Sequence, residues 1–166
     1  MKNSLRSLVR LTLMTAWAVV GVTSAFAHDV PCPLCGLKLV QGTKTQDNEV
    51  VLRYGKKKIE YRCVYCALAD AKKYEGDLFV YAPSETKGKP VILQRAGGKW
   101  SVVKDIEGKL VPEEGVVFLN AFTGHKECAG LSRAFHTKDG FDAYKGKPND
   151  AKPLDLAGML EKAGVK

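Results

Sequence analysis

Alternating hydrophobic and polar residues predict a β-hairpin at residues 49–62. Gly55 divides this stretch into two short runs, as expected for a tight turn between paired strands. The alternation in the second run places Cys63 on the core side of the sheet. The apolar spacing then changes to a helical period that ends near Tyr74, and residues 78–81 predict a third strand. The first half of the chain therefore predicts the order β-β-α-β.

The second half repeats the pattern of a hairpin followed by a helix. A polar linker at residues 84–90 leads into two apolar runs that flank residues 95–98, which is a hairpin signal. Residues 115–119 predict a strong strand, and residues 138–144 predict a short helix with Thr137 at its N-cap. Sequence identity between the two halves is negligible. Their similarity is suggested by the order of the predicted elements alone.

These elements predict an α+β fold. We expect two ββα-type units, in which short helices pack on small antiparallel sheets and the cysteines form treble-clef-like knuckles. A further short helix is predicted in the tail, at residues 153–163. The expected divisions of the chain are a signal peptide (1–27), one domain (28–146) with halves at about 28–83 and 89–146, and a C-terminal tail (147–166).

The first 27 residues have the pattern of a secretory signal peptide. Three basic residues precede an apolar run at residues 11–22, which is too short to span a bilayer comfortably. A small-x-small pattern at residues 25–27 predicts cleavage after Ala27. An uncleaved anchor is the alternative, but polar residues interrupt the run. We therefore expect a protein of the periplasm or a secreted protein, which meets a membrane only through export.

The charge pattern excludes several classes of function. Removal of the signal peptide takes three of the 26 basic residues and none of the 18 acidic ones, which leaves a net charge of +5. The lysines are scattered and have no aromatic residues between them, so we expect no nucleic-acid partner. The chain also lacks the patterns of a nucleophile triad, of a carboxylate pair for acid-base catalysis and of a phosphate-binding loop. We therefore do not expect an enzyme.

Four of the five cysteines form two Cys-x-x-Cys pairs, and all five lie beyond the expected cleavage site. The first pair, Cys32 and Cys35, stands in a proline-rich turn that Gly36 allows to reverse tightly. The second pair, Cys63 and Cys66, stands at a strand-to-helix junction, where the helix N-terminus favours thiolate over thiol. Two such pairs separated by a hairpin predict one shared metal site.

Two other interpretations of these thiols stay open. Export exposes cysteines to oxidation, so the pairs could form two local disulfides. The order strand, Cys63-x-x-Cys66, helix, strand is also that of a thioredoxin-type redox site, although the first pair would then have no role. If a metal binds, four thiolates suit Zn(II) in a closed site, whereas soft sulfur also selects Cu(I) with two or three ligands.

The histidines offer further candidates. His125 and Cys128 are three residues apart, a spacing that suits two ligands from one turn, and we expect them to complete the site or form a second one. His136 is either a ligand or a polar residue packed before the helix. Cleavage after Ala27 would make His28 the N-terminal residue, which could chelate Cu(II) or be an ordinary terminus.

The stretch Cys-Pro-Leu-Cys-Gly-Leu-Lys at residues 32–38 resembles the Cys-x-x-Cys-Gly-Met opening of NosL-type proteins, the nitrous oxide reductase accessory family. Residues 115–119 and 130–144 resemble a later block of that family. The second cysteine pair followed by a helix is similar to the TRASH and YHS metal-trafficking modules. The resemblance implies a small exported Cu(I)-binding protein that delivers copper to a cuproenzyme.

The chain departs from that family at the ligands. The copper-binding cysteine and methionine of the family would correspond to Cys35 and Leu37, and leucine cannot bind a metal. Cys63, Cys66 and Cys128 supply sulfur at places where NosL-type proteins generally lack it. The resemblance thus implies a NosL-like domain whose site has been remade toward sulfur ligands.

The sequence leads to the hypothesis of a Cu(I) chaperone, with Zn(II) as the other possible metal. It would exchange the ion with a metal-donating or metal-accepting protein, and we expect an exposed pair to exchange it while the helix-anchored pair retains it. The predicted metal ligands are Cys32, Cys35, Cys63, Cys66, Cys128 and His125. The alternatives are a structural zinc-binding module that serves as an interaction platform and a thiol-disulfide oxidoreductase.

Overall fold

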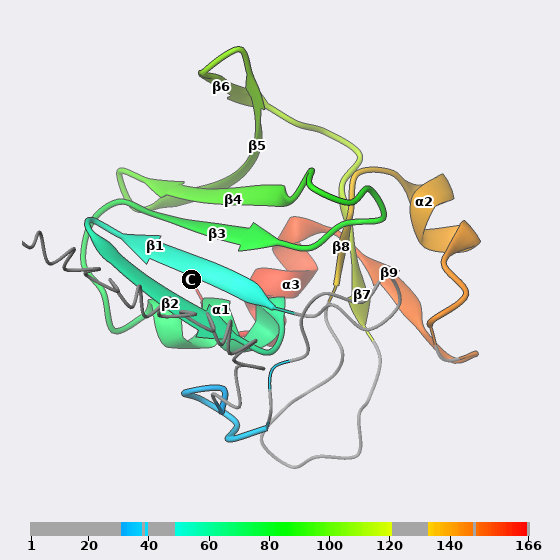
Figure 1. Ribbon diagram of the computed structural model, residues 1–166, viewed down its shortest axis with the longest axis horizontal. Coiled ribbons are helices and arrows are strands. Elements are labelled where there is room, and N and C mark those ends of the chain that lie inside the picture. The colour runs from blue at the N-terminus through cyan, green and yellow to red at the C-terminus, as the bar shows by residue number, and fades with distance from the viewer. Residues whose placement is uncertain (1–30, 38, 40–48, 121–132, 148, 166) are drawn as a thin grey trace, which may run out of the picture.

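The computed structural model describes residues 31–37, 39, 49–120, 133–147 and 149–165. These residues form two antiparallel sheets and three short helices (Figure 1). The predicted α+β class is therefore confirmed. Within the described residues, the helices are all too short or too polar to cross a membrane.

The larger sheet has six strands in the order β2-β1-β3-β4-β5-β6, and every neighbouring pair is antiparallel. Its strands are β1 (Val50–Tyr54), β2 (Lys57–Tyr61), β3 (Leu78–Ala82), β4 (Val91–Ala96), β5 (Lys99–Ile106) and β6 (Lys109–Pro112). The two predicted hairpins are β1–β2 and β4–β5. However, β3 pairs with β4 across the polar linker, so both predicted halves contribute to one sheet.

The smaller sheet has the order β8-β7-β9. Its strands are β7 (Val117–Asn120), β8 (Ala134–Phe135) and β9 (Lys152–Leu154), and its helices are α2 (Lys138–Ala143) and α3 (Leu156–Lys162). The predicted N-cap of α2 is confirmed, because Thr137 Oγ1 accepts a hydrogen bond from the Gly140 N–H at 3.0 Å. The tail is part of the fold, since β9 pairs with β7 before α3 begins.

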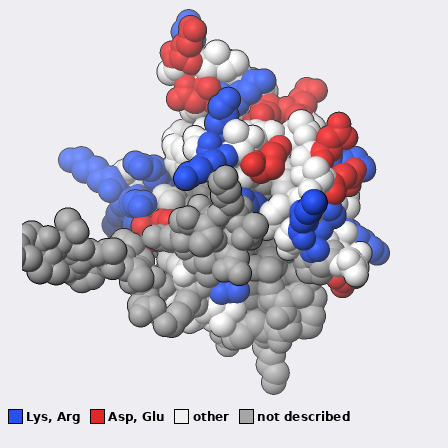
Figure 2. Space-filling model, turned by 45° about the vertical axis from the view of Figure 1, so that its right-hand side comes forward, with Lys and Arg blue, Asp and Glu red and all other residues white. Residues whose placement is uncertain are grey.

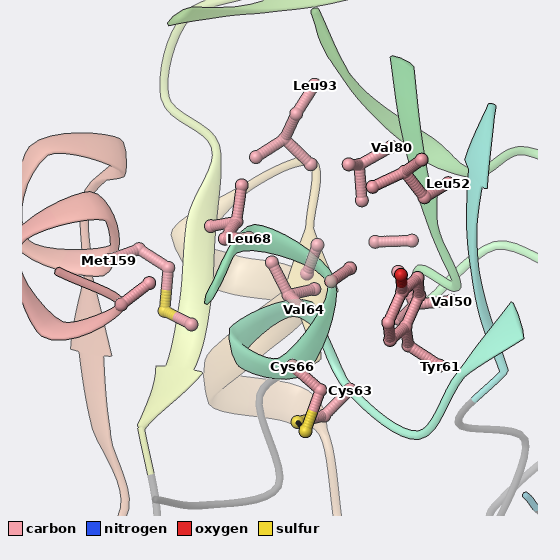
Figure 3. Packing of buried hydrophobic residues seen from close by; sticks show 14 of the residues in the cluster. Val50, Leu52, Tyr61, Cys63, Val64, Cys66, Leu68, Val80, Leu93 and Met159 are labelled. Carbon is pink, nitrogen blue, oxygen red and sulfur yellow. Dashed lines mark hydrogen bonds between the residues drawn. The ribbon is translucent and has the colours of Figure 1, made fainter. Parts of the chain in front are cut away.

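Helix α1 (Val64–Ala71) packs on one face of the larger sheet, and the main core lies between them (Figure 3). Leu52, Val80 and Leu93 reach it from the sheet, and Leu68 reaches it from α1. All four side chains are fully buried. Full burial of one such aliphatic side chain contributes about 1.5–3 kcal/mol to stability. Met159 brings α3 onto the same core. This packing fixes the helix that carries the second cysteine pair.

The C-terminal end of α1 is held by Arg95 on β4. Its guanidinium donates three hydrogen bonds to backbone carbonyls, from Nε to Gly76 at 2.8 Å, from Nη1 to Ala71 at 3.1 Å and from Nη2 to Tyr74 at 2.5 Å. Ala71 is the last residue of α1, and Tyr74 and Gly76 lie just after it, so these bonds hold both the helix end and the chain that follows. Arg95 thereby ties α1 to the sheet at the end opposite the cysteines.

Charged side chains are distributed as the sequence suggests. On the upper and right-hand parts of the face drawn in Figure 2, acidic and basic side chains lie among each other. Within β2, Lys58 pairs with Glu60 at 2.5 Å and lies 3.8 Å from Glu49. Exposed pairs of this kind contribute at most about 1 kcal/mol each, so they are a solvated surface feature rather than a support of the fold.

Candidate metal centre

The first cysteine pair stands in a tight turn at residues 32–37. Two backbone hydrogen bonds close it: the Gly36 N–H donates to the Cys32 carbonyl at 2.9 Å, and the Cys32 N–H donates to the Leu37 carbonyl at 2.9 Å. Gly36 has a φ of +68°, which glycine adopts without the steric penalty that a side chain would bring. The turn brings both thiols to the interior side, since Cys32 and Cys35 are only 2% and 3% exposed.

The second pair stands at the start of α1, as the sequence predicts. Cys63 is the N-cap residue, with extended backbone angles and no capping hydrogen bond from its side chain. Its carbonyl accepts the first helical hydrogen bond, from the Ala67 N–H at 3.2 Å. The Cys63 thiol donates instead to the Cys66 sulfur, 3.5 Å away, and the two sulfurs lie side by side below α1 in Figure 3.

The two pairs meet in one group of sulfurs. The Sγ atoms of Cys32, Cys35 and Cys66 all lie within 4.8 Å of one another, and Cys63 adjoins this group through Cys66 without belonging to it. Zn–S bonds of 2.3 Å place neighbouring sulfurs of a tetrahedral site about 3.8 Å apart, so small side-chain movements would bring the three onto one ion. Among the cysteines that the structure describes, none is in a disulfide. The group could therefore hold a metal.

The surroundings of the group favour a thiolate at Cys32. The hydrogen bond from the Cys66 thiol lowers the pKa of Cys32 to about 5; burial opposes this shift, and backbone N–H groups of Arg62, Cys35 and Leu34 reinforce it. Burial raises the pKa of Cys35. The thiolate is the form of cysteine that binds metals, so Cys32 is prepared to bind while its neighbours release protons on binding.

Of the remaining candidates, the structure describes His136. His136 is not in the group of three cysteines, and its ring nitrogens are hydrogen-bonded to Glu113 and to the Lys89 carbonyl, which supports the interpretation of a packed polar residue. His28, His125 and Cys128 lie outside the described residues, so their predicted roles stay predictions.

One expectation about the cysteines is wrong. Exposure does not distinguish an exchanging pair from a retaining pair, because Cys63 and Cys66 are 1% and 0% exposed and the first pair is equally buried. Both cysteines of the first pair belong to the main core, and Leu34 and Leu37 of the same turn pack against that core.

Sequence reasoning also missed two groups that position the site. Arg95 holds the end of α1 through Ala71, 24 positions earlier in the chain, and no local pattern marks it. The backbone N–H of Arg62, the residue before the second pair, donates to the Cys32 sulfur and links the two pairs directly. Both contacts join residues that are far apart in the sequence, so only knowledge of how those segments pack could have indicated them.

Comparison with known proteins gives no matching family model, no matching curated protein and no matching solved structure. The resemblance to NosL-type proteins at residues 32–38 therefore stays a prediction. The functional inference rests on the chemistry and geometry of the cysteine group.

Proposed function

We propose that the protein is an exported Cu(I) chaperone that receives copper from one protein and delivers it to another, such as a cuproenzyme. The observation that supports this proposal is the group of three buried sulfurs from Cys32, Cys35 and Cys66. Thiolates are soft ligands and select Cu(I) or Zn(II) over harder ions such as Mg²⁺ or Ca²⁺. Cu(I) is satisfied by two or three such ligands, which is the number that this group offers.

Transfer would proceed by exchange of thiolate ligands. A cysteine of the donor or acceptor binds the ion as one of the chaperone's own thiolates leaves, so neither the metal nor the sulfurs change oxidation state. The lowered pKa of Cys32 supplies a thiolate at neutral pH to begin the exchange. Because both pairs are buried, the short turn at residues 32–37 would have to open for a partner to reach the ion.

A structural zinc module is the second candidate. The cysteine group joins the turn at residues 32–37 to helix α1, and its members belong to the main core. An ion held there would tie together segments far apart in the chain, which is what structural zinc sites do. In that case removal of the metal would unfold the protein, whereas a chaperone must stay folded while it is empty.

The deciding experiment is a metal titration of the reduced mature protein under nitrogen. Cu(I) is added in competition with a chromogenic Cu(I) chelator, Zn(II) in competition with a zinc chelator, and native mass spectrometry counts the bound ions. We expect one Cu(I) per chain, and a metal-free protein whose circular dichroism is that of a folded chain. Failure to bind either ion would refute the proposal. Unfolding on removal of zinc would favour the structural module.

A variant without the three cysteines tests the site, and native mass spectrometry tests the signal peptide and the disulfide alternative. A variant with Cys32, Cys35 and Cys66 all changed to serine should lose copper. Of the two cysteine pairs, this variant keeps Cys63. The mass of the exported protein also tests the signal peptide, because cleavage after Ala27 predicts a chain that starts at His28. A loss of hydrogens in protein isolated without reductant would instead indicate disulfides.

A further inference from the structure

We infer that Cys63 is not a metal ligand but donates a hydrogen bond to the Cys66 sulfur, so that the site offers three thiolates and fits Cu(I) better than Zn(II). This inference rests on the proposed function and defines the coordination of the same site. It assigns different roles to two cysteines that the sequence presents as an equivalent pair.

The positions of the sulfurs are the first argument. A tetrahedral site of four thiolates requires all six sulfur–sulfur separations to be about 3.8 Å, given Zn–S bonds of 2.3 Å. Cys32, Cys35 and Cys66 come within 4.8 Å of one another, but Cys63 does not join that group although it lies 3.5 Å from Cys66. Cys63 is thus close to one ligand and not to the centre of the site.

The backbone explains this difference. Cys63 is the N-cap of α1 and has extended angles, with φ −153° and ψ 165°, whereas Cys66 is inside the first helical turn. Helix α1 is fixed by its buried residues, which include Val64 and Leu68, and by the three hydrogen bonds from Arg95. The helix therefore aims Cys66 at the first pair and leaves Cys63 beside it.

Charge is the second argument. Three thiolates around Cu(I) carry a net charge of −2 in a buried site, and buried charge is costly unless hydrogen bonds compensate it. The Cys63 thiol is placed to donate such a bond to the Cys66 thiolate, and the backbone N–H of Arg62 donates to Cys32. Hydrogen bonds to ligand atoms typically change metal affinity by about 10–100-fold.

Coordination number supplies the selectivity. Zn(II) in proteins is almost always four-coordinate, and in the described part of the chain no other Cys, His, Asp or Glu joins the three sulfurs. Zn(II) would therefore need a water molecule or a rearranged side chain as its fourth ligand. Cu(I) needs no fourth ligand, so the arrangement of the three sulfurs matches it directly.

The test compares two variants that each remove one sulfur from the same helical turn, Cys63→Ser and Cys66→Ser. Serine at position 63 keeps a donor and can cap the helix, so that variant should fold. We expect Cys63→Ser to bind one Cu(I) with an affinity within about tenfold of the parent, and Cys66→Ser to lose more than about 100-fold. Cys63→Ala, which removes the donor, should fall between them.

X-ray absorption of the Cu(I)-loaded chains counts the sulfurs. We expect three sulfurs in the parent, three in Cys63→Ser, and three in Cys128→Ser, which controls for the cysteine outside the described residues. Four sulfurs in the parent, a lower count in Cys63→Ser, or a Cys63→Ser defect as large as that of Cys66→Ser would overturn the inference. A reduced parent that binds no copper would instead refute the proposed function, so the two failures are distinguishable.

Discussion

Nδ1 of His136 lies 2.9 Å from Oε1 of Glu113, and this contact joins the end of β8 to the segment between β6 and β7. On the other side of the ring, Nε2 faces the Lys89 carbonyl at 3.0 Å. The backbone N–H of His136 donates to both carboxylate oxygens of Glu85, each at 3.1 Å. Because both ring nitrogens face oxygen acceptors, the imidazolium, which donates from both, fits this place best.

The first prediction is a pH-dependent contribution of His136 to stability. Burial lowers the pKa of His136, but the hydrogen bonds to the Lys89 carbonyl and Glu113 and the charge of Glu85 outweigh it, so the pKa is raised. A histidine whose pKa is higher in the folded than in the unfolded chain stabilises the folded state. This contribution is complete below the pKa of the unfolded chain, about 6.5, and is lost as the pH rises through the pKa of the folded chain. Urea unfolding should therefore show that His136→Gln loses more stability at about pH 5.5 than at about pH 8.5.

Glu113→Gln serves as the companion variant for this prediction. It keeps the shape of the acceptor and removes its charge, so the pKa of His136 measured by NMR should fall toward its ordinary value. The pH dependence of stability should then weaken. An equal effect of His136→Gln at both pH values would show that the histidine acts only by packing.

The second prediction concerns the three hydrogen bonds from Arg95 to the last residue of α1 and to the chain just after it. We expect Arg95→Ala to lower the free energy of unfolding by about 1–3 kcal/mol, because backbone carbonyls at the helix end lose a charged donor. Arg95→Lys should recover only part of this, since one ammonium group cannot reach three carbonyls in the geometry of a planar guanidinium. Urea denaturation of the reduced, metal-free protein measures both.

Lys99→Ala is the control for Arg95, since Lys99 is an exposed residue of the same β4–β5 hairpin. Its effect should stay within about 0.5 kcal/mol, as for most surface substitutions. If Arg95→Lys were as stable as the parent, the three-carbonyl contact would contribute nothing beyond a positive charge.

The sequence predicts those features of the fold that depend on neighbouring residues. Three such features are local: the β1–β2 hairpin that turns at Gly55, the β4–β5 hairpin that turns at residues 97–98, and the helix cap at Thr137. Each needs only a turn residue or a short polar side chain at the right place. The pairing of β3 with β4 was not predicted, because the polar linker at residues 84–90 resembles a boundary although Ser84 is buried in it.

The candidate site divides in the same way. Spacing alone predicts that the two Cys-x-x-Cys pairs share one place, and the sulfurs of Cys32, Cys35 and Cys66 do meet. Spacing treats Cys63 and Cys66 as equals, however, and their difference arises from the direction in which α1 enters the fold. That direction is set by core packing and by Arg95, which are long-range properties that periodicity does not carry.

The third prediction concerns the buried pair of Tyr61 and Asp70. The Tyr61 hydroxyl donates to Asp70 Oδ2 at 2.6 Å, and the two residues are 0% and 3% exposed. Tyr61→Phe leaves the buried carboxylate without this donor, so we expect a loss of about 1–3 kcal/mol in unfolding free energy. Tyr81→Phe, in a half-buried place on β3, is the control and should change stability by less than about 0.5 kcal/mol.

A double-mutant cycle separates that hydrogen bond from packing. Burial and then Asp70 raise the pKa of Tyr61, so the hydroxyl stays protonated and able to donate over the whole neutral range. We expect Tyr61→Phe and Asp70→Asn to be less damaging together than the sum of their single effects. Strict additivity would mean that the two groups do not interact.

The last prediction concerns the turn of the β5–β6 hairpin, where Glu107 has a φ of +52° and Gly108 a φ of +81°. Two positive φ angles define the turn that joins such strands most tightly, and asparagine or glycine is favoured at its first position. Glu107→Asn should therefore raise the free energy of unfolding by about 0.5–1 kcal/mol, since the parent residue occupies a conformation that side chains disfavour. Glu107→Gln removes the charge but keeps the side-chain shape, so it should give no gain. Equal stabilisation by Gln and Asn in urea denaturation would assign the effect to charge and contradict the conformational explanation.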